Sequence, residues 1–142
     1  MSYTVAQAAR LAGCTASQLR HWSRSELVTA SLDGGRYGFR DLVSLRVVRS
    51  LLDAGLPSAR VRAAVLSLRE HGDGDLAGLR LITDGRTVWS CRDDGQILDA
   101  LRHGQLALFV AVDRLAADVD TEIRAFQAEK AAFVDRLVSP AP

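Results

Sequence analysis

The residues best suited to chemistry in this sequence lie in one short polar stretch, "TASQLRHWSR", at positions 15 to 24. The amide of Gln18 can pair with adenine, and a small side chain such as that of Ser17 can meet a thymine methyl group. Basic side chains in the same stretch can hold phosphates, which positions a protein on DNA without reading its sequence. The candidate DNA contacts of this stretch are Ala16, Ser17, Gln18, Arg20, His21 and Arg24.

Two of these residues have a second interpretation. Gln18 stands three residues after Thr15, so its amide can instead close a helix capping box. His21 precedes Trp22 and can instead be packed beside it. For both residues, a DNA contact and a structural role stay open as alternatives.

Two short helices must position this stretch. Thr4 with Gln7, and Thr15 with Gln18, each show the spacing of a capping box, which marks the first turn of a helix. Gly13 ends the first helix and opens a short turn before the second. Two short capped helices joined by such a turn predict a helix-turn-helix.

A hairpin, or wing, is predicted next, in "VTASLDGGRYGF". Residues 27–30 are β-prone, Asp33, Gly34 and Gly35 supply a tight turn, and the chain then returns toward Phe39. Basic residues at such a tip suit a second phosphate strand or the neighbouring minor groove. The candidate DNA contacts of the wing are Arg36, Tyr37 and Arg40.

Two further helices complete the first domain. Apolar residues at helical spacing predict a third helix over about 41–53 and a fourth from Pro57 or Ser58. The sequence "HGDGD" at 71–75 breaks this pattern. We therefore expect a domain boundary here, with residues 1–71 as the first domain.

The segment that follows changes to a β pattern. Asp84-Gly85 lies between two β-rich runs, which is a strong hairpin signal, and a second turn precedes a short third strand within residues 79–99. A three-stranded meander of this length has too small a core to be stable alone. We expect residues 72–104 to form this meander and to pack on a neighbouring element.

Residues 105–138 predict one long helix, because apolar residues recur at three- and four-residue steps. A helix of that length cannot bury its whole stripe in so small a domain, and Glu122, Glu129 and Lys130 interrupt the stripe. This pattern favours a short pairing between two chains. The alternative is a helix folded back on the meander as plain core. The candidate dimerisation residues are Val112, Leu115, Val119, Ile123, Phe126 and Phe133.

The formal net charge of +1 hides an asymmetry between the two halves of the chain. Residues 1–71 hold ten arginines and five acidic residues, which gives +5, whereas the remainder holds eight basic and twelve acidic residues, which gives −4. A basic first half beside an acidic second half is expected if only the first half approaches a polyanion.

Enzymatic chemistry is not indicated. His21, His71 and His103 are scattered, and the sequence has no catalytic nucleophile motif, phosphate-binding loop or dinucleotide motif. Cys14 and Cys91 lie far apart and fit neither a disulfide framework nor a metal motif, so both are expected to be small buried residues. We expect no catalytic residue, no metal and no cofactor.

Other candidate sites have simpler alternatives. Asp93, Asp94 and Asp99 can form either a cation site or an ordinary turn. Trp89 with Phe109 can either line an effector pocket or pack as core. The sequence has neither an apolar run long enough to cross a membrane nor the start of a signal peptide, so a cytoplasmic location without membrane contact is expected.

The first half of the sequence resembles a known family. The stretches "YTVAQAARLAGCTASQLRHWSRSELV" and "GGRYGFRDLVSLRVVRSLLDAGLPSARVRAAV" are similar to the winged DNA-binding domain of the MerR family of bacterial transcription regulators. The resemblance covers residues 3–70. It implies a homodimer joined through an antiparallel pair of long C-terminal helices, bound to a pseudo-palindromic promoter. It does not cover the strands at 79–99, and the lack of a cysteine beside or after the long helix argues against metal sensing.

The sequence thus predicts a mainly α fold with small β elements: an N-terminal winged helix-turn-helix, a three-stranded meander and a long C-terminal dimerisation helix. The expected function is that of a transcriptional regulator that binds double-stranded DNA as a homodimer, with RNA polymerase or another regulator as a further partner. Two alternatives are a protein-interaction module and a sensor of an unidentified small molecule. Both would use the meander and the long helix, with DNA binding secondary.

Overall fold

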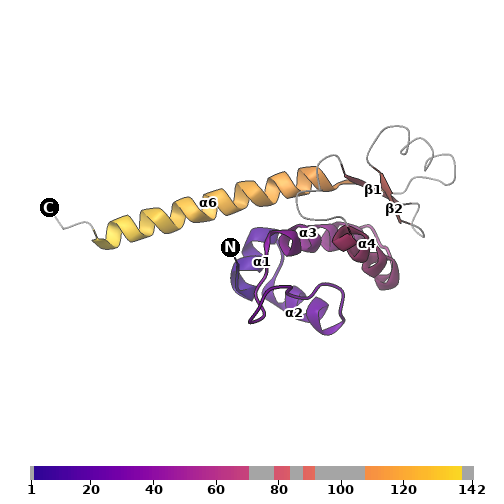
Figure 1. The fold of residues 1–142 in the computed structure, drawn as a ribbon, viewed down its shortest axis with the longest axis horizontal. Coiled ribbons are helices and arrows are strands. Elements are labelled where there is room, and N and C mark those ends of the chain that lie inside the picture. The colour runs from indigo at the N-terminus through magenta and orange to yellow at the C-terminus, as the bar shows by residue number, and fades with distance from the viewer. Residues whose placement is uncertain (1, 71–78, 84–87, 92–107, 139–142) are drawn as a thin grey trace.

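The computed structural model describes residues 2–70, 79–83, 88–91 and 108–138. This part of the chain is mainly helical, as predicted, with a small sheet before the long helix (Figure 1). None of its helices is both long and apolar enough to cross a membrane. The helices are α1 (Val5–Ala12), α2 (Ala16–Arg24), α3 (Phe39–Asp53), α4 (Ser58–Glu70) and α6 (Val112–Val138), and the strands are β1 (Arg80–Thr83), β2 (Val88–Cys91) and β3 (Leu108–Ala111).

Both predicted capping boxes are present. The Thr4 N–H donates to Gln7 Oε1 at 3.0 Å, and the Gln7 N–H donates to Thr4 Oγ1 at 3.3 Å. The same exchange joins Thr15 and Gln18, at 2.9 and 3.1 Å. Gly13 ends α1 with φ of 71°, in the left-handed region that glycine adopts without a steric penalty. The predicted helix-turn-helix, with α2 as its second helix, is confirmed.

The wing is smaller than the predicted hairpin. It consists of two isolated antiparallel bridges, one between Leu32 and Arg36 and one between Tyr3 and Tyr37. The returning arm therefore pairs with the N-terminal segment and not with residues 27–30. Leu27 is buried, and its N–H donates to the carbonyl of Trp22 at 2.9 Å. The residues expected to form the first strand of the hairpin instead close the end of α2.

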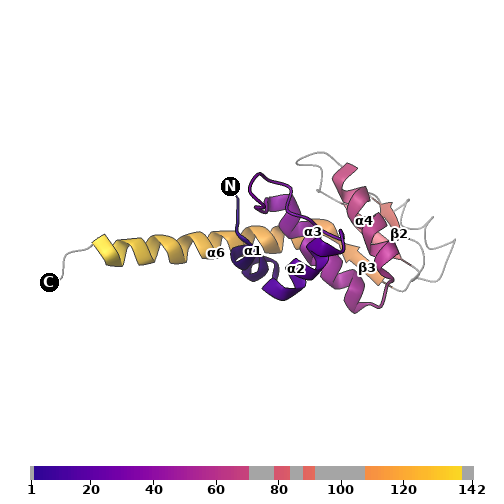
Figure 2. The same cartoon turned by 90° about the horizontal axis from the view of Figure 1, so that it is seen from below.

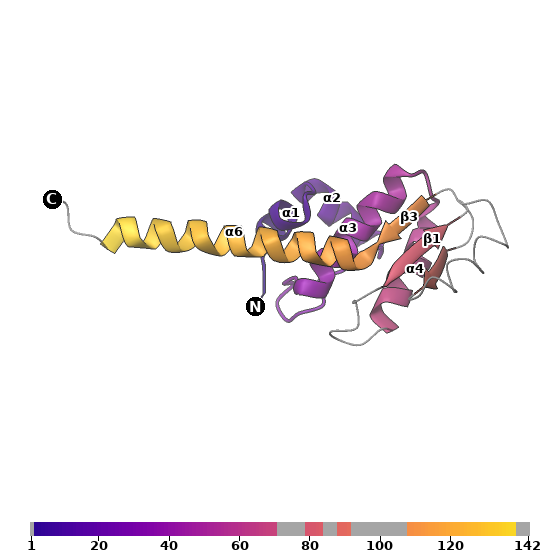
Figure 3. The same ribbon diagram turned by 90° about the horizontal axis from the view of Figure 1, so that it is seen from above.

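One core connects the helix-turn-helix with the elements that follow it. The first half of α6 lies along α1 and α3 (Figure 2), and its Val112 and Val119 are fully buried in the same cluster as Leu19, Leu42 and Leu45. Leu79 and Leu81 extend that cluster beneath the sheet, which packs on α4 and on the start of α6. The second half of α6 projects beyond the rest of the molecule (Figures 1 and 3).

The sheet does not have the predicted topology of a meander. Its strand order is β2-β1-β3, with β1 in the centre and antiparallel to both neighbours. In a meander each strand pairs with the next one along the chain, whereas here β3 returns to pair with β1. The third strand expected before residue 99 lies outside the described residues.

The long helix begins later than predicted. Residues 108–111, expected to be helical, form β3, and α6 starts at Val112 (Figure 3). Leu108, Phe109 and Val110 are compatible with either a strand or a buried helix, because a short apolar run has no decisive period. Pairing with β1 makes these residues a strand. The Val112 N–H extends this pairing by donating to the carbonyl of Leu79 at 3.0 Å.

Candidate nucleic-acid interface

Helix α2 has one buried and one polar face. Leu19 and Trp22 are buried in the core, which fixes the rotation of the helix. The opposite face is exposed over most of its length, and His21 belongs to this face and is not packed in the core. Among the predicted contacts in α2, Ala16 is half-buried and the exposed ones are Ser17, Gln18, Arg20, His21 and Arg24.

The cations of this face are free to meet a ligand. Within the described part of the chain, Arg20 and Arg24 take part in no hydrogen bond or ion pair with protein groups. Gln18 is different, because its Oε1 already accepts the N–H of Thr15. A bidentate contact with adenine uses both the oxygen and the nitrogen of the amide. Ser17 is therefore better placed than Gln18 to meet a base edge.

Arg36 of the wing is held by the N-terminal segment. Its Nε donates to Ser2 Oγ at 2.7 Å and its Nη2 donates to the carbonyl oxygen of Ser2 at 3.2 Å. These bonds fix the guanidinium at the edge of the wing. Sequence reasoning missed Ser2, because nothing in its type or spacing shows that the N-terminal segment returns to the wing.

The predicted DNA contact by Tyr37 is wrong. The side chain is only 2% exposed and belongs to the core, and burial raises the pKa of its hydroxyl, as does the nearby carboxylate of Asp41. Successive side chains of an extended segment alternate between two faces. Because Arg36 faces outward, its neighbour Tyr37 faces inward.

Arg40 is occupied within the protein. Its Nη2 donates to the carbonyl of Leu68, near the C-terminal end of α4, where helix carbonyls lack partners in their own helix. The side chain is half-buried. Arg40 thus ties α3 to α4, and a phosphate contact would have to compete with this bond.

Asp41 anchors both arms of the wing. Its buried Oδ2 accepts three hydrogen bonds, from Gly38 N at 2.8 Å, Ser31 N at 3.2 Å and Ser31 Oγ at 2.6 Å. Ser31 precedes the tip of the wing and Gly38 follows it. The sequence carried a signal for this role, since Gly38 and Asp41 have the spacing of a helix N-cap and its third residue.

Several arginines of the basic half support the fold. Arg46 Nη2 donates to the carbonyl of Leu11 at 3.0 Å, and Arg49 donates to the carbonyl of Gly13. Arg62 Nη2 donates to the carbonyl of Ser25 at 2.8 Å, just after α2. Cations at the C-terminal ends of helices stabilise the unpaired carbonyls there. The positive charge of residues 1–71 therefore overstates the charge available to a polyanion.

The predicted dimerisation residues divide into two groups. Val112 and Val119 are fully buried within one chain, so the prediction that they contact a second chain is wrong. Leu115, Ile123 and Phe126 are half-buried against the same core. Phe133 belongs to the projecting half of α6, where it is 55% exposed, together with Val134 and Leu137.

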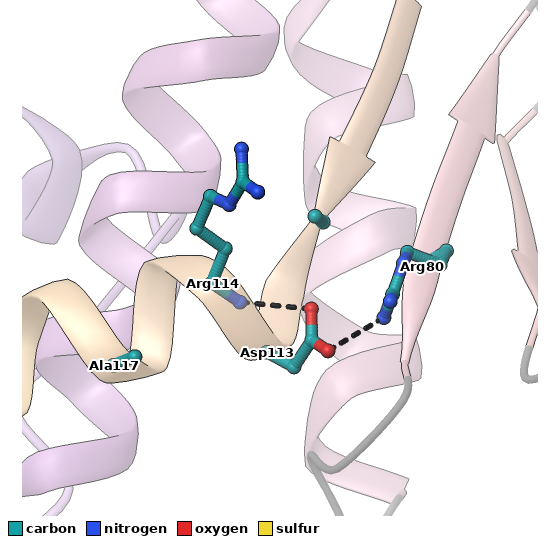
Figure 4. A pocket seen from close by; sticks show the side chains of 5 residues that line it. Arg80, Asp113, Arg114 and Ala117 are labelled. Carbon is teal, nitrogen blue, oxygen red and sulfur yellow. Dashed lines mark hydrogen bonds and ion pairs between the residues drawn. The ribbon is translucent and has the colours of Figure 1, made fainter.

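A cavity of about 600 Å³ lies where β3 passes into α6 (Figure 4). Arg80 Nη1 lies 2.8 Å from Asp113 Oδ2, and the backbone N–H of Arg114 donates to Asp113 Oδ1 at 2.8 Å. Ala111 and Ala117 also line the cavity. Within the described part of the chain, the Arg114 guanidinium forms no hydrogen bond or ion pair with the protein, so the cavity carries a cation beside a neutralised pair.

The effector pocket and cation site considered above involve residues that are partly or wholly outside the described part of the chain. Asp93, Asp94 and Asp99 lie outside the described residues, and the side chains of Trp89 and Phe109 are not described. Among the described residues, His, Cys, Asp and Glu side chains form no group of three that could hold a metal ion. Cys14 is half-buried, Cys91 is buried, and neither forms a disulfide.

Comparison with known proteins supports the geometry of the first half. Residues 3–68 match the family described as MerR HTH family regulatory protein. Proteins named uncharacterized HTH-type transcriptional regulators, from Mycobacterium bovis and Mycobacterium tuberculosis, are 32% identical over 147 aligned residues. These alignments cover 99% of this chain and 65% of each relative, so the chain spans less than two thirds of the relatives' length. Residues 3–68 therefore form a helix-turn-helix domain of the MerR family.

Proposed function

We propose that the chain is a transcriptional regulator that binds double-stranded DNA through the exposed face of α2. The observation that carries this proposal is that Arg20 and Arg24 have no partner among the described residues, on a helix whose other face is held in the core by Leu19 and Trp22. A helix held in this way can enter a major groove without rearrangement. The names of the mycobacterial relatives agree with this function.

The roles along α2 follow from position and chemistry. Ser17 lies in the first turn, the part of a second helix that meets base edges. Arg20, His21 and Arg24 lie further along and suit phosphates. Arg36 adds a phosphate contact from the wing. Tyr37 contributes only by holding the wing to the core.

The proposed assembly is a homodimer joined through the projecting half of α6. Phe133 and Leu137 are one turn apart and are 55% and 68% exposed, which leaves an apolar face for a second copy of the same helix. A variant carrying both Phe133→Asp and Leu137→Asp is expected to be monomeric by light scattering. A persistent dimer would place the interface elsewhere.

Selection from a random double-stranded DNA library tests the proposed function. The 142-residue chain is expected to enrich a sequence with two inverted half-sites, since a symmetric dimer presents two copies of α2. The variant carrying both Phe133→Asp and Leu137→Asp should bind only a single half-site, and more weakly than the unsubstituted chain binds the full sequence. Failure to enrich any sequence at moderate salt would contradict specific DNA binding.

A second candidate function is that of a ligand sensor, favoured by the cavity beside Arg114. The lining includes Arg80, Asp113 and Arg114, and the cation of Arg114 suits a small anion. Inorganic phosphate and citrate are suitable probes, because a ligand that binds only the folded state raises the melting temperature. A rise that Arg114→Ala abolishes would support sensing, and no rise with either probe would contradict it.

A further inference from the structure

Ser2 and Tyr3 lie between the long helix and the wing. Tyr3 and Tyr37 exchange two backbone hydrogen bonds, each of 2.8 Å, and both rings are buried. Neither residue can shift without breaking this pair or moving its partner. The N-terminal segment is therefore fixed to the returning arm of the wing.

The same segment also contacts α6. The rings of Tyr3 and Phe126 meet edge to face, with centroids 6.4 Å apart and an interplanar angle of 76°. The Arg10 guanidinium lies over the Phe126 ring, 5.7 Å from its centroid. It also forms an ion pair with Glu129, three residues after Phe126 on α6. Phe126 and Glu129 are the last residues of α6, within the described chain, for which a side-chain contact with the helix-turn-helix domain is found. Beyond them the helix projects away from the domain (Figures 1 and 3).

A third set of contacts reaches the proposed DNA surface. Ser2 accepts both hydrogen bonds from the Arg36 guanidinium, through its hydroxyl and its carbonyl oxygen. An unbroken series of contacts thus runs from Phe126 through Tyr3 and Ser2 to Arg36. The energies of aromatic edge contacts and short hydrogen bonds depend steeply on geometry. A displacement of Phe126 therefore changes the position of Arg36.

We propose that Ser2 and Tyr3 are positioning residues that couple the orientation of α6 to the DNA affinity of the wing. The coupling rests on the proposed function, since its readout is DNA binding by Arg36. A force on the projecting half of α6, such as that from a second copy of the chain, acts first on the last contacts between this helix and the domain, which Phe126 and Glu129 make. The guanidinium of Arg36 is then held in position to bind a phosphate only while the ring of Phe126 keeps its contact with Tyr3.

Hydrogen exchange in the free protein tests the link without any DNA. Phe126→Ala should make the Tyr37 amide exchange about two- to tenfold faster, the range expected for loss of one aromatic pair that supports a local structure. Phe126→Leu, which keeps most of the apolar volume, should act in the same direction. Ile123→Ala is the matched control, because it also loosens α6 on the core but has no ring contact with Tyr3. Unchanged exchange at Tyr37, or equal acceleration by Ile123→Ala, would overturn the proposal.

A double-mutant cycle on DNA tests the coupling itself. Phe126→Ala and Arg36→Ala should be less than additive in their effects on affinity for the selected sequence, because Phe126 acts through Arg36. Ile123→Ala and Arg36→Ala should be additive. Additive effects for the Phe126 pair would refute the coupling. If the protein bound no DNA but Tyr37 exchange still responded to Phe126→Ala, the link would stand and the proposed function would fail.

Discussion

The wing depends on a single carboxylate oxygen, and replacing Asp41 tests this most sharply. Asp41→Ala removes the acceptor of three hydrogen bonds and leaves the N–H groups of Ser31 and Gly38 without a partner in the protein. Hydrogen bonds to a charged group contribute about 1.5–3 kcal/mol each, and an orphaned donor costs about 1–3 kcal/mol when water cannot replace its partner. Because Ser31 is exposed and water can reach it, we expect a total loss of about 2–4 kcal/mol in the free energy of unfolding.

Two further variants make the Asp41 experiment decisive. All three bonds end on Oδ2, so the single oxygen of Asp41→Asn can keep them without the charge, and the expected loss is only about 1 kcal/mol. Asp53→Ala, on the same helix, removes only an exposed pair with Arg49 at 3.9 Å and should cost less than about 0.5 kcal/mol. Urea unfolding followed by circular dichroism at pH 7 measures all three. A loss for Asp41→Ala no larger than that for Asp53→Ala would refute the anchoring role.

Three other predictions concern single side chains. Glu26 lies two residues beyond the end of α2 and has φ of 59°, so Glu26→Gly should raise the free energy of unfolding by about 1 kcal/mol, as measured by urea unfolding, and a lower value would contradict this. The pKa of Tyr37 is raised chiefly by burial, so the unfolded chain ionises first, and the stability that this tyrosine contributes is present below about pH 10 and lost as the pH rises further. Tyr37→Phe should reduce this alkaline loss in unfolding curves at pH 8 and 11, whereas an unchanged loss would assign it to other groups. Burial also raises the pKa of Cys14, so iodoacetamide at pH 8 should modify it more slowly in the folded than in the urea-unfolded protein, as followed by peptide mass spectrometry. Equal rates would show that the thiol is accessible and normally acidic.

Local sequence chemistry was sufficient to predict the helix-turn-helix. The two capping boxes and Gly13 act within a few residues of one another, so they need no knowledge of the rest of the fold. The same holds for the division of α2 into a buried face with Leu19 and Trp22 and a polar face opposite. These elements position most of the proposed DNA surface.

Long-range pairing accounts for what the sequence did not predict. Tyr3 and Tyr37 are distant in sequence, and their bridge turns Tyr37 into the core while Arg36 stays at the surface. Residues 108–111 have no decisive period of their own and become a strand because β1 offers an edge. The sequence located the apolar stripe of α6 correctly. It left two partners possible for Val119, a second chain or the core of its own domain. Only the position of α1 and α3 decides between them.

The most direct test of the central claim is the salt dependence of DNA binding, measured by fluorescence anisotropy with the selected sequence. Each of Arg20→Ala and Arg24→Ala should weaken binding and lower the slope of log K against log salt by about 1, the change expected for one lost phosphate contact. The control is Arg124→Ala, which removes an exposed arginine of α6 that pairs with Asp120 at 3.0 Å. We expect the control to keep the affinity and the salt slope of the unsubstituted chain. In the two α2 variants, both the affinity and the salt slope should fall. If Arg20→Ala, Arg24→Ala and Arg124→Ala all had the same affinity and the same salt slope, α2 would not face the DNA.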